Sequence, residues 1–459
     1  MALNLSRNTR VWFTTNVNPT TGVLPDSATG YTAFTSANTY ELQVLDGYSF
    51  SQGTANTAIT LSEAGNTPNR GQRSFNTALN PVDLSFSTYI RPRVATNVTC
   101  IEKVLWNALT GSETIDSTGV VVTNITRAST LSPTVTIVGA TAFTGFAVGD
   151  AVNITGVTGT LDWNSPAVII SSNGAGPYTL IATMAEAPAT LTAALGGTLK
   201  VFKGQWAETP TNAYTSFVGS NKNQLQKFAM IFMVDNAIYI VDNCALNQAV
   251  IDFGLDAISM IAWTGFGTAV KKAATLAIAN LSSATAYSTS ANYITNKLSS
   301  TTLVSNIGGA SGTSYSVPLT GGSITINNNI AYITPSNLGV VNVPIGYYTG
   351  TRSITGSLNA YLKTGSAGDT GSLLSDILTT SASAPETKFK LQVEVGGSIN
   401  AVRVELDIPG ASLSVPTIDI ADVVSTTINF TAQGSDALLS TNNYDITATN
   451  DMTVRYYSS

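Results

Sequence analysis

Alternating apolar and polar residues predict that most of this chain forms β-strands. The clearest alternation runs through Lys390–Val395 (KLQVEV) and Arg403–Ile408 (RVELDI), where every second side chain is apolar. This pattern is typical of antiparallel strands that bury one face. Gly396 and Gly397 separate the two runs and are expected in a hairpin turn or loop. Thr, Ser, Val, Ile and Asn dominate elsewhere, between Gly/Asn turns, so the expected fold class is all-β.

Two segments depart from this alternation and predict one short helix in each half of the chain. They are Cys100–Leu109 (CIEKVLWNAL) and Ser372–Leu378 (SLLSDIL), whose apolar residues recur at helical spacing. Each helix follows a strand that ends in Tyr and an aliphatic residue, and precedes a strand that begins Lys-Phe. The four dipeptides are Tyr89-Ile90 and Lys227-Phe228 in the first half, and Tyr361-Leu362 and Lys388-Phe389 in the second. The order of elements is therefore expected to recur.

An ungapped internal alignment supports the same repeat. Residues 243–267 (NCALNQAVIDFGLDAISMIAWTGFG) align with residues 410–434 (GASLSVPTIDIADVVSTTINFTAQG). The aligned positions include Ile251 with Ile418, Asp252 with Asp419 and Gly267 with Gly434. Because apolar and polar positions keep their phase, the same faces should be buried in both copies. A chain that carries two copies of a β unit presents two similar edges to its neighbours.

The first half contains material that the second half lacks. β-type runs between Gly-rich turns fill residues 127–203, so we interpret this segment as a small β domain inserted in a loop. The alternative, a long structureless loop, fits poorly with so many β-type runs. The expected division is a first domain at 1–126 and 204–267, the insert at 127–203, a partly helical linker at 268–290 and a second domain at 291–459.

Composition narrows the classes of function. The chain has 459 residues, no His, two Cys, 10% charged residues and a net charge of −6. A typical soluble domain has about 25% charged residues, so extensive subunit contacts are expected. Without His, Ser-His-Asp and Cys-His-Asp catalysis are impossible, although Ser-Lys, Thr and carboxylate schemes are not. Cys100 and Cys244 have no zinc-type spacing, and no nucleotide-binding motif is present. We therefore expect no enzyme, no metal and no cofactor.

Two groups of residues are candidates for a functional site. Glu63, Arg70 and Gly71 form the densest local cluster of charged and turn-forming residues, which fits either a loop contacting a neighbouring subunit or a solvated turn. Asp252 and Asp419 could form a carboxylate pair. However, residues related by a repeat should lie at matching positions in two domains, too far apart to act together. No apolar stretch approaches the roughly 20 residues that span a membrane, and the start resembles no secretory signal.

The sequence resembles the tail tube proteins (major tail proteins) of T-five-like long-tailed siphophages. The stretches that carry the resemblance are LSRNTRVWFTT (5–15), the EAG…P.RG…F core (63–75), LNPVDLSFSTYIRP (79–92), VDNCALNQAVID (241–252), LTGGSITINNNIAYITP (319–335) and VPIGYYTGTRSITGSLNAYL (343–362). The resemblance implies two tandem tube-type β-sandwich or barrel domains. Members of this family carry an additional immunoglobulin-like domain at the C-terminus, whereas this chain has the insert.

The resemblance also implies a function. Three chains would form a pseudo-hexameric ring, and stacked rings would conduct genomic DNA through their lumen without binding it. The partners would be other copies of the chain and tail proteins such as the tape measure and the tail terminator. The protein would be made in the host cytoplasm and reside in the virion tail. The alternative is a fibre or adhesin whose insert recognises a cell surface.

Within this reading, Glu394, Glu405 and Asp407 are expected to face the lumen. They alternate with apolar neighbours and share a non-core face, where an acidic lining would repel phosphate. The alternative is that this face lies on the outer wall, because alternation does not distinguish the two polar sides. The insert is expected to decorate the outer wall.

Overall fold

The computed structural model confirms the all-β class. It describes residues 9–18, 23–24, 34–35, 38–59, 73–91, 102–110, 120–127, 134–144, 151–157, 166–173, 178–184, 195–203, 207–208, 225–235, 237–255, 257–273, 293–305, 314–365, 368–383, 388–396, 403–420, 423–433 and 452–457. Within them the α-helices are α1 (Lys103–Thr110) and α4 (Thr370–Ser383). These are the two expected helices, although α1 begins after Cys100 and α4 extends beyond Ser372–Leu378. Much of the expected linker, residues 274–290, lies outside the described residues.

The first strand group, as we call it, consists of two layers that share one strand, β13 (Ala237–Asp252). One layer pairs in the order β2–β1–β12–β13–β15. The other pairs in the order β3–β4–β14–β13. The bounds of these strands are β1 Thr9–Thr14, β2 Thr39–Leu42, β3 Ser49–Ile59, β4 Arg73–Tyr89, β12 Phe228–Val234, β14 Met260–Gly267 and β15 Ala269–Ala273.

The second strand group repeats this pairing order around its own shared strand, β23 (Arg403–Leu413). One layer pairs as β17–β16–β22–β23–β26, and the other as β18–β21–β25 followed by β23 and β24. The bounds are β16 Ser300–Ser305, β17 Ser314–Ser316, β18 Leu319–Asn327, β21 Ser353–Tyr361, β22 Lys388–Val395, β24 Thr417–Asp419, β25 Ser425–Gln433 and β26 Met452–Tyr457. The two alternating runs, Lys390–Val395 and Arg403–Ile408, lie in β22 and β23, which pair antiparallel as expected for a hairpin.

A bend allows one strand to serve both layers of the first group. The N-terminal part of β13 pairs with β12 and β15, and its C-terminal part pairs with β14 and β18. Asn243 lies at the change of partner with φ 47°, a left-handed conformation that Asn tolerates better than most residues. Gly267 packs close to this point, because a Cβ there would lie 2.5 Å from Val241 Cγ1.

The core lies between the layers and under the two helices. Trp106 of α1 packs edge-to-face on Trp263 of β14, with 5.2 Å between ring centroids, and Trp263 Nε1 donates to Thr88 Oγ1 at 2.9 Å. In the second group, Leu373 and Ile377 of α4 are buried in the same cluster. Burying each such side chain contributes about 1.5–3 kcal/mol, so the helices hold the layers together.

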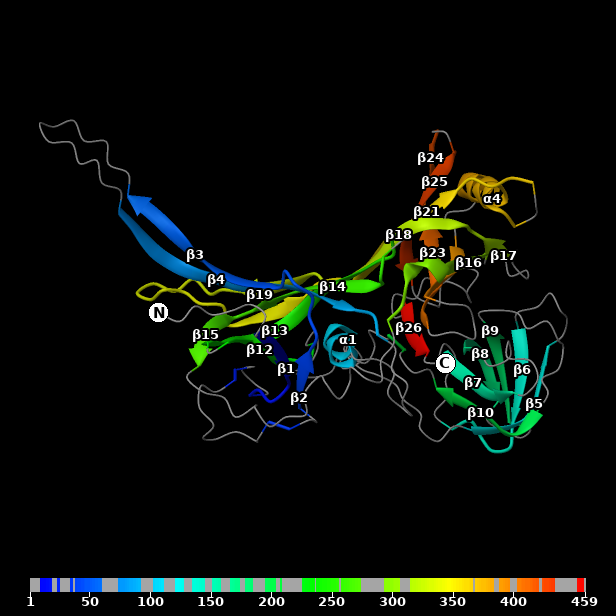
Figure 1. Cartoon of the computed structure of the whole chain (residues 1–459), viewed down its shortest axis with the longest axis horizontal. Helices are drawn as coiled ribbons and strands as arrows, with labels where there is room; N and C mark the ends of the chain where they lie inside the picture. Colours follow the sequence, from blue (N-terminus) through cyan, green and yellow to red (C-terminus); the bar gives the residue numbers. More distant parts are fainter. Residues whose placement is uncertain are drawn as a thin grey trace, which may run out of the picture.

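Six further strands pair in a closed ring, in the order β10–β5–β6–β9–β8–β7 (Figure 1). Their bounds are β5 Val120–Arg127, β6 Thr134–Gly139, β7 Ala151–Val157, β8 Pro166–Asn173, β9 Thr179–Met184 and β10 Leu195–Lys203. The ring thus includes β5, which precedes the expected boundary at residue 127; the division into domains stays a prediction. After it, β11 (Ala207–Glu208) pairs with β26.

The remaining elements are small. They are the 3-10 helix η3 (Asn296–Leu298) and the hairpin β19 (Ile330–Ile333)–β20 (Gly346–Thr349). No helix in the described part of the chain is both long and apolar enough to cross a membrane.

Candidate functional site

The candidate site is one continuous sheet that runs through both strand groups, here called the long sheet. Its eight strands pair in the order β3–β4–β14–β13–β18–β21–β25–β24. β3 and β4 extend as an arm at one end of the molecule, while β24 and β25 lie at the other (Figure 1). Because side chains alternate across a strand, one face of this sheet covers the core. The other, here called the open face, is covered at Phe266, where Tyr332 of the β19–β20 hairpin packs with 6.0 Å between ring centroids.

The open face of the long sheet is polar and nearly uncharged. Its side chains are mostly hydroxyls and amides, with three exposed acids, Asp83, Asp252 and Asp419. The one basic residue in the eight described strands is Arg73, which begins β4 opposite Ile59. Residues that share this face are Ser49, Ser51, Ser85, Ser87, Gln248, Thr264, Ser323, Thr325, Asn327, Thr355, Ser357, Asn359, Thr427, Asn429 and Thr431. A surface of this chemistry offers hydrogen bonds to water but nothing that neutralises phosphate.

The pairing of β13 with β18 joins the two strand groups, and it is called the junction below. Ile251 lies opposite Ile324, with exposed fractions of 1% and 0%. On the open face, Val250 lies opposite Thr325 and Asp252 opposite Ser323. The junction therefore buries an apolar pair on the core side, and on the open side it presents Asp252, Ser323 and Thr325 together with one apolar residue, Val250.

Hydroxyl groups of the β19–β20 hairpin donate to backbone carbonyls near the bend of β13 and before β12. Tyr332 Oη donates to the Asn243 carbonyl at 2.6 Å, and Tyr347 Oη donates to the Leu225 carbonyl at 2.8 Å. Burial raises the pKa of Tyr332 well above its ordinary value. Asn328 is buried and donates through Nδ2 to the Leu109 carbonyl at 2.7 Å.

Both end strands of the long sheet have an edge with no strand on it. Within the described residues, β3 pairs only with β4, and β24 pairs only with β25. Ile418, which aligns with the buried Ile251, has an exposed fraction of 44% in β24. Val415, Ile420 and Val423 near it are also exposed. Such an edge is a ready template for another strand.

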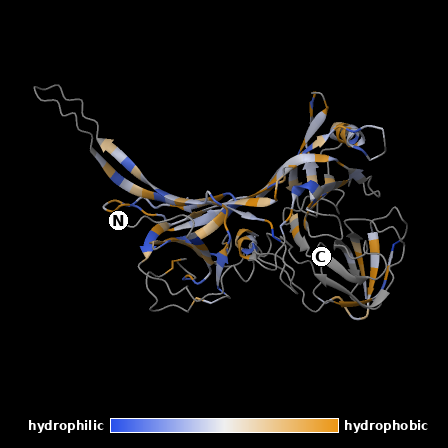
Figure 2. Ribbon diagram, in the orientation of Figure 1, coloured by the Kyte–Doolittle hydropathy of each residue, from blue (hydrophilic) through white to orange (hydrophobic). Residues whose placement is uncertain are grey.

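The arm formed by β3 and β4 is exposed on both faces away from the rest of the sheet. Phe75 has an exposed fraction of 60%, and residues 56–58 opposite the start of β4 are exposed too. Bands of hydrophilic and hydrophobic residues alternate along the arm (Figure 2). The residues expected to form a subunit contact, Glu63, Arg70 and Gly71, connect these two strands in sequence but lie outside the described residues.

The three acids expected to face a lumen lie on β22 and β23, outside the long sheet's open face. Glu394 pairs with Glu405, and Asp407 pairs with Gln392. The Glu394 carboxylate accepts a hydrogen bond from Ser300 Oγ at 3.0 Å, and Glu394 is 5% exposed in the single chain. Their lumen-facing position stays a prediction.

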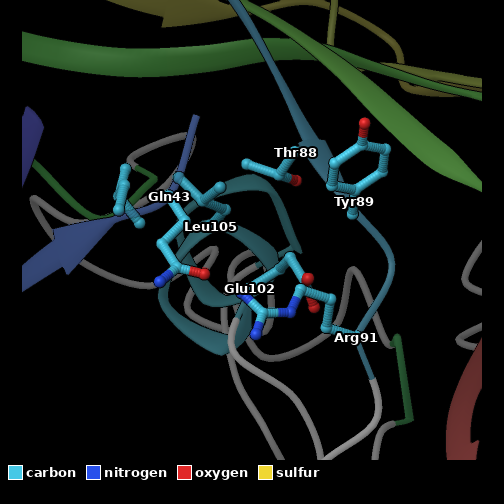
Figure 3. Close-up of a pocket in the computed structure, with 7 residues that line it drawn as sticks. Gln43, Thr88, Tyr89, Arg91, Glu102 and Leu105 are labelled. Carbon is cyan, nitrogen blue, oxygen red and sulfur yellow. The ribbon is translucent and has the colours of Figure 1, made fainter. Parts of the chain in front are cut away.

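A small pocket lies where β4 ends (Figure 3). Arg91 and Glu102 line it beside Thr88 and Leu105, and it adjoins an open pocket of about 430 Å³. The Arg91 guanidinium, almost fully buried, stacks 4.7 Å from the ring centroid of Tyr293. The lining offers no nucleophile paired with a base. Nor do the described residues gather three or more His, Cys, Asp or Glu side chains that could hold a metal.

Sequence reasoning missed the open face of the long sheet, although its signal is present. The stretches DLSFSTY, SITIN and SITGSLNAY alternate as clearly as the two runs on β22 and β23. What the pattern lacks is the identity of each strand's neighbours. Only the pairing of β4, β14, β13, β18, β21 and β25 places these residues on one surface.

Comparison with known proteins agrees with this architecture. The phage tail tube protein family matches residues 185–432, more than half of the chain. The chain is also 27% identical over 445 residues to the tail tube protein pb6 of Escherichia phage T5, an alignment that covers 95% of this chain and 74% of that protein. The chain therefore belongs to the phage tail tube protein family and is a structural protein of the virion tail.

Proposed function

We propose that three copies of this chain form a closed ring with pseudo-sixfold symmetry, and that stacked rings form a tube that conducts duplex DNA. The observation that carries this proposal is the recurrence of one strand-pairing order in both groups, joined edge to edge at the junction. A chain that contains two ring units needs three copies where a single-unit chain needs six. Closed cyclic symmetry is the usual way to satisfy such unpaired edges.

The open face of the long sheet is proposed to line the lumen. Three copies bring about 24 strands, which at ~4.8 Å spacing give a circumference of about 115 Å, and strand tilt widens the barrel. Without tilt, the distance between opposite backbones would be about 37 Å before side chains are counted, and tilt increases it. The acids Asp83 and Asp252 would repel phosphate, and the uncharged hydroxyl and amide groups would not neutralise it. DNA would therefore slide through the lumen without being held.

The other parts of the chain are proposed to lie outside this lumen. The insert, centred on the closed ring of β5–β10, is proposed to lie on the outer wall, where it leaves the channel free. The arm formed by β3 and β4 is exposed on both faces, so it is proposed to contact neighbouring copies. Glu63, Arg70 and Gly71, between these two strands in sequence, are proposed to take part in that contact. Other tail components would bind the ends of the stack.

Ring size is tested by electron microscopy and native mass spectrometry of the purified protein. We expect rings or stacked tubes with three chains per ring and six similar densities around the axis. A ring of six chains contradicts the proposal, because each chain would then supply one unit.

The lumen face is tested by labelling introduced cysteines in assembled tubes. In a Ser357→Cys variant, a small maleimide should react while a maleimide on a large polymer should not, because the polymer is too wide for the channel. Asp46→Cys, on an exposed loop outside the long sheet, is the matched control and should react with both. Glu405→Cys tests, in the same assay, the prediction that Glu405 faces the lumen. Polymer labelling of Ser357→Cys in intact tubes would exclude the lumen assignment.

A further inference from the structure

We propose that β24 pairs antiparallel with β3 of a second copy of this chain, in the register that places Ile418 opposite Phe50. This inference rests on the proposed ring and adds the register of its contact. The junction between β13 and β18 within one chain is the template, because each of its two strands has a counterpart at a free end of the long sheet.

β3 is the counterpart of β18. β3 pairs with β4 as β18 pairs with β21, so that Ser49 faces Ser85 where Ser323 faces Ser357. The strands β4 and β21 also end alike. After Tyr89, the Ile90 nitrogen donates to the Ser259 carbonyl at 3.0 Å; after Tyr361, the Leu362 nitrogen donates to the Val424 carbonyl at 3.0 Å. Ser49, Phe50 and Ser51 therefore correspond to Ser323, Ile324 and Thr325.

β24 is the counterpart of the C-terminal part of β13. Ile251 and Asp252 align with Ile418 and Asp419, and both strands pair on one side with matching partners, β14 and β25. The difference lies on the other side. There β13 is covered by β18, whereas β24 has no strand beside it among the described residues.

Transferring the register of the junction gives pairs of matching chemistry. Ile251 opposite Ile324 becomes Ile418 opposite Phe50, so two exposed or half-buried apolar side chains would cover each other on the core side. Asp252 opposite Ser323 becomes Asp419 opposite Ser49, and Val250 opposite Thr325 becomes Thr417 opposite Ser51. These two pairs lie on the open face and would continue its polar lining from chain to chain.

The orientation of Phe50 agrees with this register. Its ring stacks on Phe232 with centroids 4.5 Å apart, so it points to the core side, as Ile324 does. Ser49 and Ser51 on either side of it are exposed. A register shifted by one residue would instead oppose Ile418 to a serine and turn its side chain away from the core.

Disulfide trapping tests the register. In assembled tubes, the Thr417→Cys/Ser51→Cys variant should oxidise readily, because directly opposed residues lie within bridging distance. Each chain would then be linked to the next, so denaturing gels without reductant should show a closed covalent trimer. The control Thr417→Cys/Ser49→Cys is displaced by two residues, beyond easy bridging, and should cross-link at least tenfold less. Val250→Cys/Thr325→Cys should form an internal bridge that leaves the mass unchanged. The unaltered chain controls for Cys100 and Cys244.

The outcomes separate this inference from the proposed function. Tubes that trap the displaced pair, or that trap neither pair while the internal pair oxidises, overturn the register and leave the ring intact. An unaltered chain that forms no ring overturns the proposed function. If the cysteine variants do not assemble, a charge test replaces them. Asp419→Lys with Ser49→Asp should assemble at a concentration several-fold lower than Asp419→Lys with Ser49→Lys; equal concentrations overturn the register.

Discussion

Ile251 on β13 and Ile324 on β18 face each other directly across the junction, and both are buried. The two residues belong to different halves of the chain, yet they form one continuous layer of core. Ile418, which aligns with Ile251, has no such neighbour in the single chain. The same sequence position is therefore a core residue in one copy and a surface residue in the other.

This contrast predicts that the same substitution destabilises the chain by different amounts at the two positions. In the unassembled chain, Ile251→Ala should lower the free energy of unfolding by about 2–5 kcal/mol, because it leaves a cavity beside Ile324. Ile418→Ala should lower it by less than about 1 kcal/mol, because the side chain is already partly in water. Urea unfolding of both variants measures the difference. Equal losses would show that Ile418 is packed within the single chain.

Asn328 is expected to hold helix α1 to the junction. Its buried Nδ2 donates to the carbonyls of Leu109 and Leu246, at 2.7 and 3.3 Å. Asn328→Ala should destabilise the chain by about 1–3 kcal/mol, because both buried carbonyls lose a donor. The control is Asn359→Ala on the exposed face, which should cost less than about 0.5 kcal/mol. Thermal unfolding followed by circular dichroism compares them, and an unchanged midpoint for Asn328→Ala contradicts the role.

Asp242 is expected to be costly to neutralise. It is buried at the bend of β13, forms an ion pair with Lys271 and accepts a hydrogen bond from the Leu24 nitrogen at 2.8 Å. Asp242→Asn should destabilise by about 3–5 kcal/mol, because Lys271 then loses its counter-charge. Adding Lys271→Met should recover part of the loss. The control is Lys272→Met, at an exposed position of β15, the strand that also contains Lys271. Chemical unfolding compares the variants. Additive losses in the double variant would rule out coupling.

Tyr332 predicts a loss of stability in alkali. Its pKa is raised by burial, so the folded chain holds this proton more tightly than the unfolded chain does. Its contribution is complete below the ordinary tyrosine pKa of about 10 and is lost as pH rises through the raised value. Unfolding free energies between pH 8 and pH 11 should fall more steeply for the parent chain than for Tyr332→Phe. Parallel curves would contradict the prediction.

The sequence by itself determined the elements whose signal is local. Alternation predicted β22 and β23, helical spacing predicted α1 and α4, and the aligned stretches around Ile251 and Ile418 predicted a repeat. Such patterns depend on which face of one element is buried. They can therefore be recognised without knowing which other element covers the buried face.

Only the tertiary structure decided which strands are neighbours. The junction of β13 with β18, the bend at Asn243 and the single polar face shared by Asp83 and Asp252 all depend on pairing between residues far apart in the chain. Alternation fixes the two faces of a strand but not the strand beside it, and register is set by contacts on both sides. For that reason Glu394, Glu405 and Asp407 had the same sequence signal as the long sheet's open face, although they lie on strands outside it.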